Sequence, residues 1–482
     1  MAWRALALLY VVALAECDNV LGKSVVVVGA GMSGLGAARK LADAGFTVTV
    51  VEARARLGGR VHTDTTSAPG VALDLGASWI HGASKKNPLV DLAKRAGAST
   101  ATFTDSGRQY WASGVELSAA EEARQDALLA KMEKGVASRQ SSNKDASLLA
   151  SARAAVGYGQ LSARDQQLAD FLINSNYEQE YSGAASDMST WWFDNDEAYP
   201  GEDAVFTNAA GYSALPAFLA KGLDVRFGHV VTSVSESAGS VTVAGANFSL
   251  SADHVVVSLP LGVLKSGSVR FSPALSSAKQ QAISKLGMGL LDKVALVFDR
   301  VFWRAQDDWI EFLSDAEPRW QFSEWVSLKR STGKNVLMAF NAANAAKQLA
   351  QSSDVELVAQ AMAALRKIYG AGVPNPVRSV VTRWSADPFA RGSYSFNALG
   401  SSPSMRTALA ATAGKRVFFA GEALHNQYFG TVHGAYETGL AAATKLIKVA
   451  GKRSMRGVAQ PEAVDVVEER ESAPAEAGPH TM

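Results

Sequence analysis

Cysteine and long apolar runs are nearly absent from this chain of 482 residues. Cys17 is its one cysteine, so no intrachain disulfide and no cysteine-based metal cluster can form. The apolar run at residues 1–15 is too short to span a bilayer comfortably, which needs about 20 residues, and no later segment qualifies. Its Arg, apolar stretch and small-residue end are typical of a cleaved signal peptide, with an uncleaved hydrophobic segment as the alternative. We therefore expect a secretory or extracellular protein, in which Asn247 would be the glycosylation site.

The chain also lacks a large net charge, because 47 Lys and Arg face 46 Asp and Glu and leave a formal charge of +1. Without a basic excess there is no general field to attract nucleic acid, so no such partner is expected. The length suits two connected domains, because single cores stop growing at about 250–300 residues. Residues 451–482 are rich in Glu, Ala, Pro and Arg without a core pattern, which predicts a disordered tail.

A strand–turn–helix–strand unit is predicted where the leader ends. Residues 24–28 are a β-branched run typical of a buried parallel strand, residues 33–44 have helical character, and residues 47–52 predict a second strand. A second unit of the same kind is predicted at the other end, with a strand at 416–420 and a helix at 436–449.

Between these units the pattern changes twice. Residues 87–219 are predicted to be mostly helical, with Asn87-Pro88 and a Ser118/Glu121 capping box as helix starts. Further on we expect strands at 225–257 and 290–298 and a helix at 354–369. The middle of the chain must therefore supply a second, discontinuous domain, and the fold class is α/β.

A glycine motif links the first strand to its helix. Gly29 permits a tight turn, Gly31 lets the backbone approach a pyrophosphate, and Gly34 lets the helix pack against the strand. Glu52 ends the second strand about 20 residues on, where a carboxylate would bind ribose hydroxyls and disfavour NADP. The sequence predicts a dinucleotide site, for either FAD or NAD.

Six separated motifs cover most of residues 23–448: VVVVGAGMSGLGAARKL, EARARLGGRV, LDLGASWIHG, LLDKVALVFDRVFW, TRWSADPFARGSYSF and FFAGEALHNQYFGTVHGAYETGLAAA. In this order they resemble the flavin-containing amine oxidases, with polyamine oxidases such as spermine and acetylpolyamine oxidases nearest. The catalytic domain of lysine-specific histone demethylases is also similar. The resemblance implies a Rossmann-like FAD-binding domain at 23–86, about 222–290 and 385–450. It implies a substrate-binding domain of mixed sheet and helices at about 87–221 and 291–384.

The resemblance also implies which residues hold FAD. Monoamine oxidases carry their flavin-linking Cys where this chain has Ser393, so FAD would be noncovalent here. By position, the ADP and pyrophosphate would lie on Ser33, Glu52, Arg54 and Arg60, and the adenine on Val231. The ribityl chain and ring would lie along Gly76, Ala77, Ser78, Trp79, Gly421, Glu422, Thr431 and Val432.

Lys293 interrupts an apolar strand, which is unusual for lysine unless it lies at an exposed edge. The resemblance instead implies that it reaches flavin N5 through a water. It likewise implies that Trp384 and Tyr394 line the flavin and the substrate channel, although such aromatics are more often core residues. Thr431 stands where monoamine oxidases have a tyrosine, which favours extended substrates. His81 would lie near the reacting nitrogen, with a purely structural histidine as the alternative.

Remote ammonium groups of a polyamine need carboxylates or aromatic faces. Glu178 matches an acid of the family's helical domain and is our preferred candidate, with Glu180 and Asp187 near it in sequence. The acidic segment 194–203 is expected to steer substrate, although a charge run is normally a solvated face.

The implied reaction oxidises the carbon beside an amine nitrogen, with molecular oxygen as the final acceptor and hydrogen peroxide as product. An L-amino-acid oxidase is the alternative within the enzymes, but no Arg can be assigned to a substrate carboxylate. A histone demethylase is disfavoured by the leader and by the lack of a long coiled insertion. A catalytically silent flavin-binding scaffold is the alternative from another class.

Overall fold

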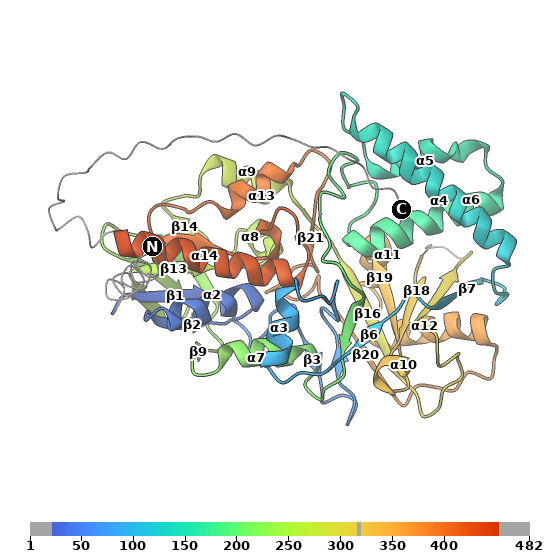
Figure 1. The fold of residues 1–482 in the computed structure, drawn as a ribbon, viewed down its shortest axis with the longest axis horizontal. Helices are drawn as coiled ribbons and strands as arrows, with labels where there is room; N and C mark the ends of the chain where they lie inside the picture. The colour runs from blue at the N-terminus through green and yellow to red at the C-terminus, as the bar shows by residue number, and fades with distance from the viewer. Residues whose placement is uncertain (1–21, 316–319, 453–482) are drawn as a thin grey trace, which may run out of the picture.

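The computed structural model describes residues 22–315 and 320–452. The predicted leader, Cys17 and nearly all of the predicted tail lie outside this part of the chain. Two regions lie side by side (Figure 1), one built on a parallel sheet and the other on a largely antiparallel sheet. The expected α/β class is confirmed. Within the described ranges, no helix has both the length and the apolarity needed to cross a bilayer.

A five-stranded parallel sheet is the centre of the first region. Its order is β22-β13-β1-β2-β9, so strands from both ends of the chain are neighbours. The strands are β1 (Ser24–Val28), β2 (Thr47–Val51), β9 (Asp224–Arg226), β13 (His254–Val257) and β22 (Val417–Phe419). All four valines of β1 are buried, because both faces of the sheet are covered, as is usual for parallel sheets.

Helices cover one face of this sheet. They are α2 (Met32–Asp43), α3 (Pro88–Arg95), α7 (Ala214–Ala220) and α14 (Val432–Lys452). The first and last of these, blue and red in Figure 1, pack against each other. Leu89 of α3 and Leu215 of α7 belong to the same apolar core as Val25 and Leu35. Both helices therefore pack with the dinucleotide side, although the sequence division placed residues 87–221 with the substrate domain.

A second sheet covers the opposite face. Its strands are β10 (Val231–Glu236), β11 (Val241–Gly245), β12 (Ser249–Ala252) and β14 (Arg270–Ser272). Beside them lie α8 (Leu261–Lys265), α9 (Ser277–Lys285) and α13 (Pro403–Ala410). Val26 and Val28 of β1 pack into this layer, which explains why β1 has no polar face.

The six-stranded sheet of the second region has the order β20-β16-β19-β18-β17-β7. Its strands are β7 (Gly107–Trp111), β16 (Leu291–Val297), β17 (Trp309–Leu313), β18 (Glu324–Ser327), β19 (Val336–Ala342) and β20 (Arg378–Val381). Val294 and Leu296 pack with the buried face of α12 (Asp354–Tyr369). Because side chains alternate along a strand, Lys293 projects from the opposite face.

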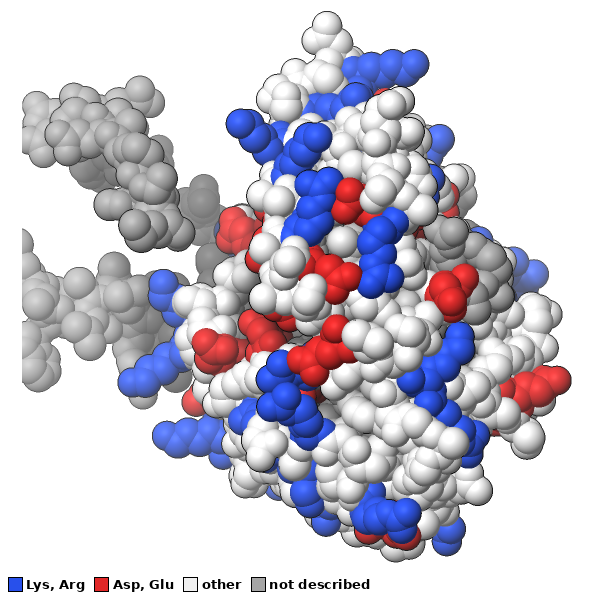
Figure 2. Space-filling model, turned by 90° about the vertical axis from the view of Figure 1, so that its right-hand side faces the viewer, with Lys and Arg blue, Asp and Glu red and all other residues white. Residues whose placement is uncertain are grey.

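A helical layer lies above that opposite face (Figure 1). It contains α4 (Ala119–Gln140), α5 (Leu148–Val156), α6 (Ala163–Ile173) and the π-helical turn η2 (Asn174–Gln179). Figure 2 shows this side of the molecule, where Asp and Glu gather across the middle with Lys and Arg above and below.

The remaining elements are short. The strands are β3 (Thr63–Asp64), β4 (Leu73–Asp74), β5 (Trp79–Ile80), β6 (Thr100–Phe103), β8 (Asp203–Phe206), β15 (Gly287–Met288) and β21 (Ser395–Phe396). The helices are α10 (Lys329–Thr332), α11 (Ala343–Leu349), η1 (Tyr158–Gln160), η3 (Gly211–Ser213) and η4 (Glu422–Leu424).

The predicted helix starts at Asn87 and Ser118 are confirmed, including both hydrogen bonds of the capping box. Residues 87–219 are less helical than predicted, because β6, β7 and β8 form there by pairing with other strands, in β7's case one about 200 residues away. The last helix begins at Val432 rather than at residue 436. Thr431 caps it, since its Oγ1 accepts a hydrogen bond from the backbone N–H of Gly434 at 2.9 Å.

The close packing of α14 on α2 depends on a glycine. A Cβ added to Gly439 would lie 2.1 Å from the carbonyl oxygen of Ser33. We expect Gly439→Ala to lower the free energy of unfolding by about 1–3 kcal/mol, as overpacked cores do. Gly451→Ala in the same helix is the control, because its Cβ would meet nothing within 4 Å. Equal thermal unfolding midpoints for the two variants would contradict this reading.

Candidate functional site

A large cavity runs from the start of α2, between the two regions, to the six-stranded sheet. Its volume is about 1440 Å³, which exceeds the roughly 300–1,000 Å³ of ordinary small-molecule sites. The cavity therefore has room for a dinucleotide together with a second ligand. In the described part of the chain, no three His, Cys, Asp or Glu side chains are grouped to hold a metal ion.

The glycine turn at the start of α2 fits a pyrophosphate. Gly29 has a φ of +102°, and a Cβ on Gly34 would lie 2.0 Å from the Gly29 carbonyl oxygen. Gly31 caps the helix without a side chain, and the first turn carries no acid. Free N–H groups at a helix start without an acidic neighbour attract phosphate. Gly29, Gly31 and Ser33 line the cavity, whereas Gly34 lies behind them and shapes the turn.

Glu52 lies at the end of β2 and is 4% exposed. Its carboxylate accepts hydrogen bonds from the backbone N–H of Ala30 at 2.8 Å and of Arg54 at 2.9 Å. The guanidinium of Arg54 pairs with Asp387 at 2.7 Å. Val231 begins β10 and lines the cavity together with Glu52 and Arg54. The three residues expected at the ADP end are thus brought to one end of the cavity.

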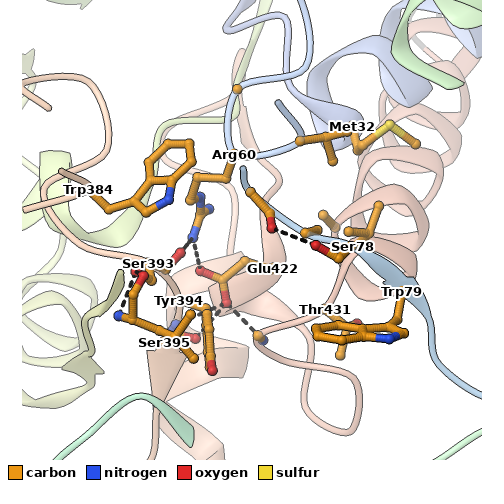
Figure 3. A pocket seen from close by; sticks show the side chains of 18 of the residues that line it. Met32, Arg60, Ser78, Trp79, Trp384, Ser393, Tyr394, Ser395, Glu422 and Thr431 are labelled. Atoms are coloured by element: carbon orange, nitrogen blue, oxygen red, sulfur yellow. Dashed lines mark hydrogen bonds and ion pairs between the residues drawn. The ribbon is translucent and has the colours of Figure 1, made fainter. Parts of the chain in front are cut away.

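Arg60 and Glu422 form the central ion pair of the site, at 2.7 Å (Figure 3). Burial alone would raise the pKa of Glu422, but the charge and hydrogen bond of Arg60 lower it overall. Glu422 also accepts hydrogen bonds from Ser395 Oγ at 2.7 Å and from the backbone N–H of Gly430 at 2.9 Å. The ionised carboxylate therefore joins three segments that are far apart in the sequence.

The other positions expected along the cofactor divide into two groups. Gly76, Ala77, Ser78, Trp79, Thr431 and Val432 line the cavity. A Cβ on Gly76 would lie 1.8 Å from the Arg60 carbonyl oxygen. Only glycine therefore fits where this segment passes Arg60. Gly421 is not part of the lining. Its φ is +141°, and it turns the chain from β22 into η4, which presents Glu422.

Lys293 is buried, with 3% of its surface exposed, so the exposed-edge alternative is wrong. Its ammonium donates to the carbonyl oxygens of Gly76 at 2.6 Å and Asp74 at 3.1 Å, and to Ser78 Oγ at 2.6 Å. The ring of Phe340 lies 5.0 Å away. Burial lowers the pKa of Lys293 to about 7, although the charge of Asp74 opposes the shift. Lys293 can therefore change its charge near neutral pH.

His81 faces the cavity, and its Nδ1 lies 2.7 Å from Asp203 Oδ2. Desolvation acts to lower the pKa of His81, but the hydrogen bond and charge of Asp203 raise it overall. Asp203 also accepts a hydrogen bond from the backbone N–H of Gly82 at 2.9 Å, which fixes its orientation. His81 and Asp203 thus form a dyad that can hold a proton at the cavity wall.

Aromatic side chains close the cavity around the ion pair. Trp384 is 7% exposed and its indole N–H donates to the Leu75 carbonyl at 3.2 Å. The Tyr394 hydroxyl donates to the Gln179 carbonyl at 2.9 Å, and burial raises its pKa. In Figure 3, Trp384 and Trp79 lie on opposite sides of the Arg60–Glu422 pair. Thr431, at the start of α14, lines the same cavity.

Two of the three acids predicted to bind substrate lie elsewhere. The Glu178 carboxylate accepts from the backbone N–H of Ala185 at 2.9 Å and from Asn174 Nδ2 at 3.1 Å, and it does not line the cavity. Asp187 is exposed outside the cavity. Glu180 does line it. The π-helical turn η2 explains the difference, because it changes the rotation per residue and turns Glu180 inward.

The sequence reasoning missed several residues of this wall. Asp203 was expected only to steer substrate, and Gln109, Glu311, Glu324 and Phe340 were not considered, although all five line the cavity. A signal was present at Glu311, which interrupts the apolar strand sequence WIEFL just as Lys293 interrupts its own strand. What the sequence could not supply was the pairing of these strands.

Comparison with known proteins agrees with this geometry. Residues 32–447 match the model of the flavin containing amine oxidoreductase family. Polyamine oxidase 2 of Arabidopsis thaliana is 35% identical over 443 residues, which cover 87% of each chain. Polyamine oxidase 4 of Oryza sativa subsp. japonica is 32% identical over 442 residues, which cover 88% of each chain.

Two further comparisons support less specific conclusions. Lysine-specific histone demethylase 1 homolog 2 of Arabidopsis thaliana is 35% identical over 441 residues, which cover 89% of this chain but only 59% of that protein. The structure of wild-type putrescine oxidase bound to putrescine superposes with a TM-score of 0.73 over 89% of this chain and 99% of that one. At 20% identity the latter shows a shared fold.

The matching family model, the two polyamine oxidases and the dinucleotide cradle all lead to the same assignment. The chain belongs to the flavin-containing amine oxidoreductases, acts on CH–NH groups and uses FAD as its cofactor.

Proposed function

We propose that this protein is a polyamine oxidase acting on spermine, spermidine or an acetylated polyamine. The observation that carries the proposal is the charge of the cavity wall beyond Lys293. Ten carboxylates line that part: Asp105, Glu122, Asp126, Glu180, Asp196, Glu197, Glu202, Asp203, Glu311 and Glu324. The other Lys and Arg of the described lining, Arg54, Arg60 and Arg391, lie toward the dinucleotide end. Such a wall favours a substrate with several positive charges.

The proposed reaction removes two electrons and two protons from a CH–NH unit to give an imine. Water then converts the imine into an aldehyde and a shorter amine. Oxygen takes up the two electrons with two protons and leaves as hydrogen peroxide. Bound FAD, held noncovalently, supplies the two-electron acceptor.

The residues of the chain have separate tasks in this scheme. His81, held by Asp203, lies on the wall where it can exchange a proton with the reacting nitrogen. Lys293 holds a positive charge beside Gly76 and Ser78, where negative charge develops during electron transfer. Trp384, Tyr394 and Thr431 exclude water and orient the substrate, while Glu180 attracts its remote charge.

A methylated lysine of a peptide is the second candidate substrate. The demethylase homologue favours it, because that protein is as similar to this chain as polyamine oxidase 2. This chain spans under two thirds of the demethylase homologue, however, so the shared part alone does not indicate the activity.

The first test is a peroxide assay on a substrate panel. We expect spermine, spermidine or acetylspermine to give peroxide, and benzylamine, L-amino acids and a dimethyl-lysine peptide to give little, because only the polyamines carry remote charges along a flexible chain. Peroxide from amino acids or peptide alone would overturn the polyamine assignment. A flavin that no compound bleaches would favour a silent binding protein.

The pH dependence should differ between the two half-reactions. Amine-dependent bleaching should speed up as pH rises, because His81 and the reacting nitrogen must lose their protons. Recovery of colour with oxygen should slow as pH rises through about 7, because Lys293 loses its charge there. Stopped-flow measurements of the two steps check this, and parallel pH profiles would argue against the separate tasks.

Replacing the lysine isolates its task. Lys293→Met should slow the oxygen step about 10- to 100-fold, as loss of a positioned charge does, and should abolish its pH dependence near 7. Lys279→Met is the matched control, because burial also lowers the pKa of Lys279 to about 7 but its ammonium contacts Leu409 and Phe419 outside the cavity. If the pH profile of the oxygen step were unchanged in Lys293→Met, Lys293 would not have this role.

A further inference from the structure

Strand register places five cavity residues in one row across the six-stranded sheet. Gln109 pairs with Glu311, Glu311 with Glu324, Glu324 with Phe340, and Phe340 with Lys293. All five line the cavity. The row therefore leads from the lysine at the centre of the site, past an aromatic ring, to two carboxylates on neighbouring strands.

The far end of this row has too many acceptors and too few donors. Gln109 Nε2 donates to Glu311 at 2.6 Å, but the Oε1 of Gln109 is buried without a partner. Gln179, which is 6% exposed and lines the same cavity, also has a buried Oε1 without a partner. Glu324 is 6% exposed. Among the described residues no Lys or Arg forms an ion pair with Glu311 or Glu324.

Ser175 donates a hydrogen bond to Glu324 and Gln109 donates one to Glu311, but neither donor carries a charge. Carboxylates removed from water are costly unless a cation or several donors compensate them. Directly paired residues on antiparallel strands have Cβ atoms about 4.5–5.5 Å apart, so Glu311 and Glu324 repel each other when both are ionised. Burial, with the charge of Glu311, raises the pKa of Glu324 well above its usual value, and burial raises that of Glu311. Both shifts disfavour ionising the two neighbouring carboxylates together.

The neighbouring elements do not neutralise the pair. Glu180 faces it from the segment after η2 and adds negative charge. Tyr394 supplies no compensating charge, because burial and the charges of Glu180 and Glu324 raise its pKa and keep its phenol neutral. Glu122 and Asp126 of α4 and Asp105 line the same part of the cavity. The lysine of the row is separated from the pair by the strand of Phe340. A group with several N–H donors and a positive charge is what this end lacks.

We propose that Glu311 and Glu324 form the binding site for the remote, non-reacting ammonium of the substrate, and that this ammonium displaces the proton the two carboxylates share. The inference rests on the proposed function and names the residues that select a second charge. The ammonium adds one positive charge, the pair goes from one negative charge to two, and the proton passes to the solvent.

The spacing of the row agrees with this assignment. Neighbouring strands lie about 4.8 Å apart, so Glu324 lies two strands, roughly 10 Å, from Lys293. An extended chain of single bonds advances about 1.3 Å per bond, so the two nitrogens must be separated by several methylenes. Phe340, with Trp309 and Trp79 packed around it, offers an apolar surface to those methylenes. A monoamine would leave the two carboxylates without a cation.

Binding can be measured without turnover on holoenzyme reduced with dithionite under anaerobic conditions. The probes are diaminooctane and its single-charge match octylamine, titrated calorimetrically in two buffers of different ionisation enthalpy. We expect wild type to release about one proton more on binding the diamine than on binding octylamine. Glu311→Gln with Glu324→Gln should weaken diamine binding about 10- to 100-fold, abolish this extra proton release and leave octylamine affinity unchanged.

The control is Glu116→Gln, which removes a carboxylate of the same region that pairs with Arg108 outside the cavity. Its diamine affinity should equal that of wild type. The glutamines of the double variant have the same shape as the glutamates and remove their repulsion, so the variant should fold. Yellow absorbance of the oxidised enzyme and an unfolding midpoint like that of wild type would verify this. Unchanged diamine affinity in the double variant would overturn the inference. Failure of the proposed function would appear separately, as oxidised wild type that no polyamine bleaches.

Discussion

The buried ammonium of Lys293 is the interaction on which the site depends. Its three N–H groups match three acceptors of the segment 74–78, so one side chain ties the strand β16 of the second region to the loop that follows β4. A lone buried cation would be unstable, and these acceptors are what make it tolerable. The same contacts fix Gly76 and Ser78 against Arg60, and hence fix the wall of the dinucleotide half.

Charge divides the cavity into two parts with opposite requirements. At the dinucleotide end, free N–H groups of α2 and the guanidinium groups of Arg54 and Arg60 are suited to phosphate. At the other end carboxylates predominate, and the described lining there holds no Lys or Arg besides Lys293. In the proposed function, an anionic cofactor and a cationic substrate would thereby be directed to different ends of the cavity, with Lys293 between them.

The spacing of residues along the sequence was sufficient to predict the dinucleotide end of the cavity. Gly29, Gly31, Gly34 and Glu52 act within one strand–helix–strand unit, so their geometry follows from neighbouring residues. Glu178 was preferred because it matches an acid of the family's helical domain by position, and such a match does not reveal local winding. Glu178 lies within the π-helical turn η2, and Glu180, just after it, is the acid that lines the cavity. The sequence could not predict that Glu311 and Glu324 lie together, for a different reason. Their meeting depends on the register of β17 and β18 with β19, and no local pattern determines that register.

The sheet itself supplies an order that a set of loops would not. Because consecutive strands are held at a fixed separation, Lys293, Phe340, Glu324 and Glu311 keep a fixed sequence of charge, apolar ring and carboxylates. α12 packs on the opposite face and keeps these strands rigid. In the proposed function, selection for separated charges would follow from this backbone spacing, to which the helical layer with η2 and Glu180 does not contribute. In the proposed function, this arrangement would explain why Lys293 and the two carboxylates lie on strands and not on the acidic loop at 194–203.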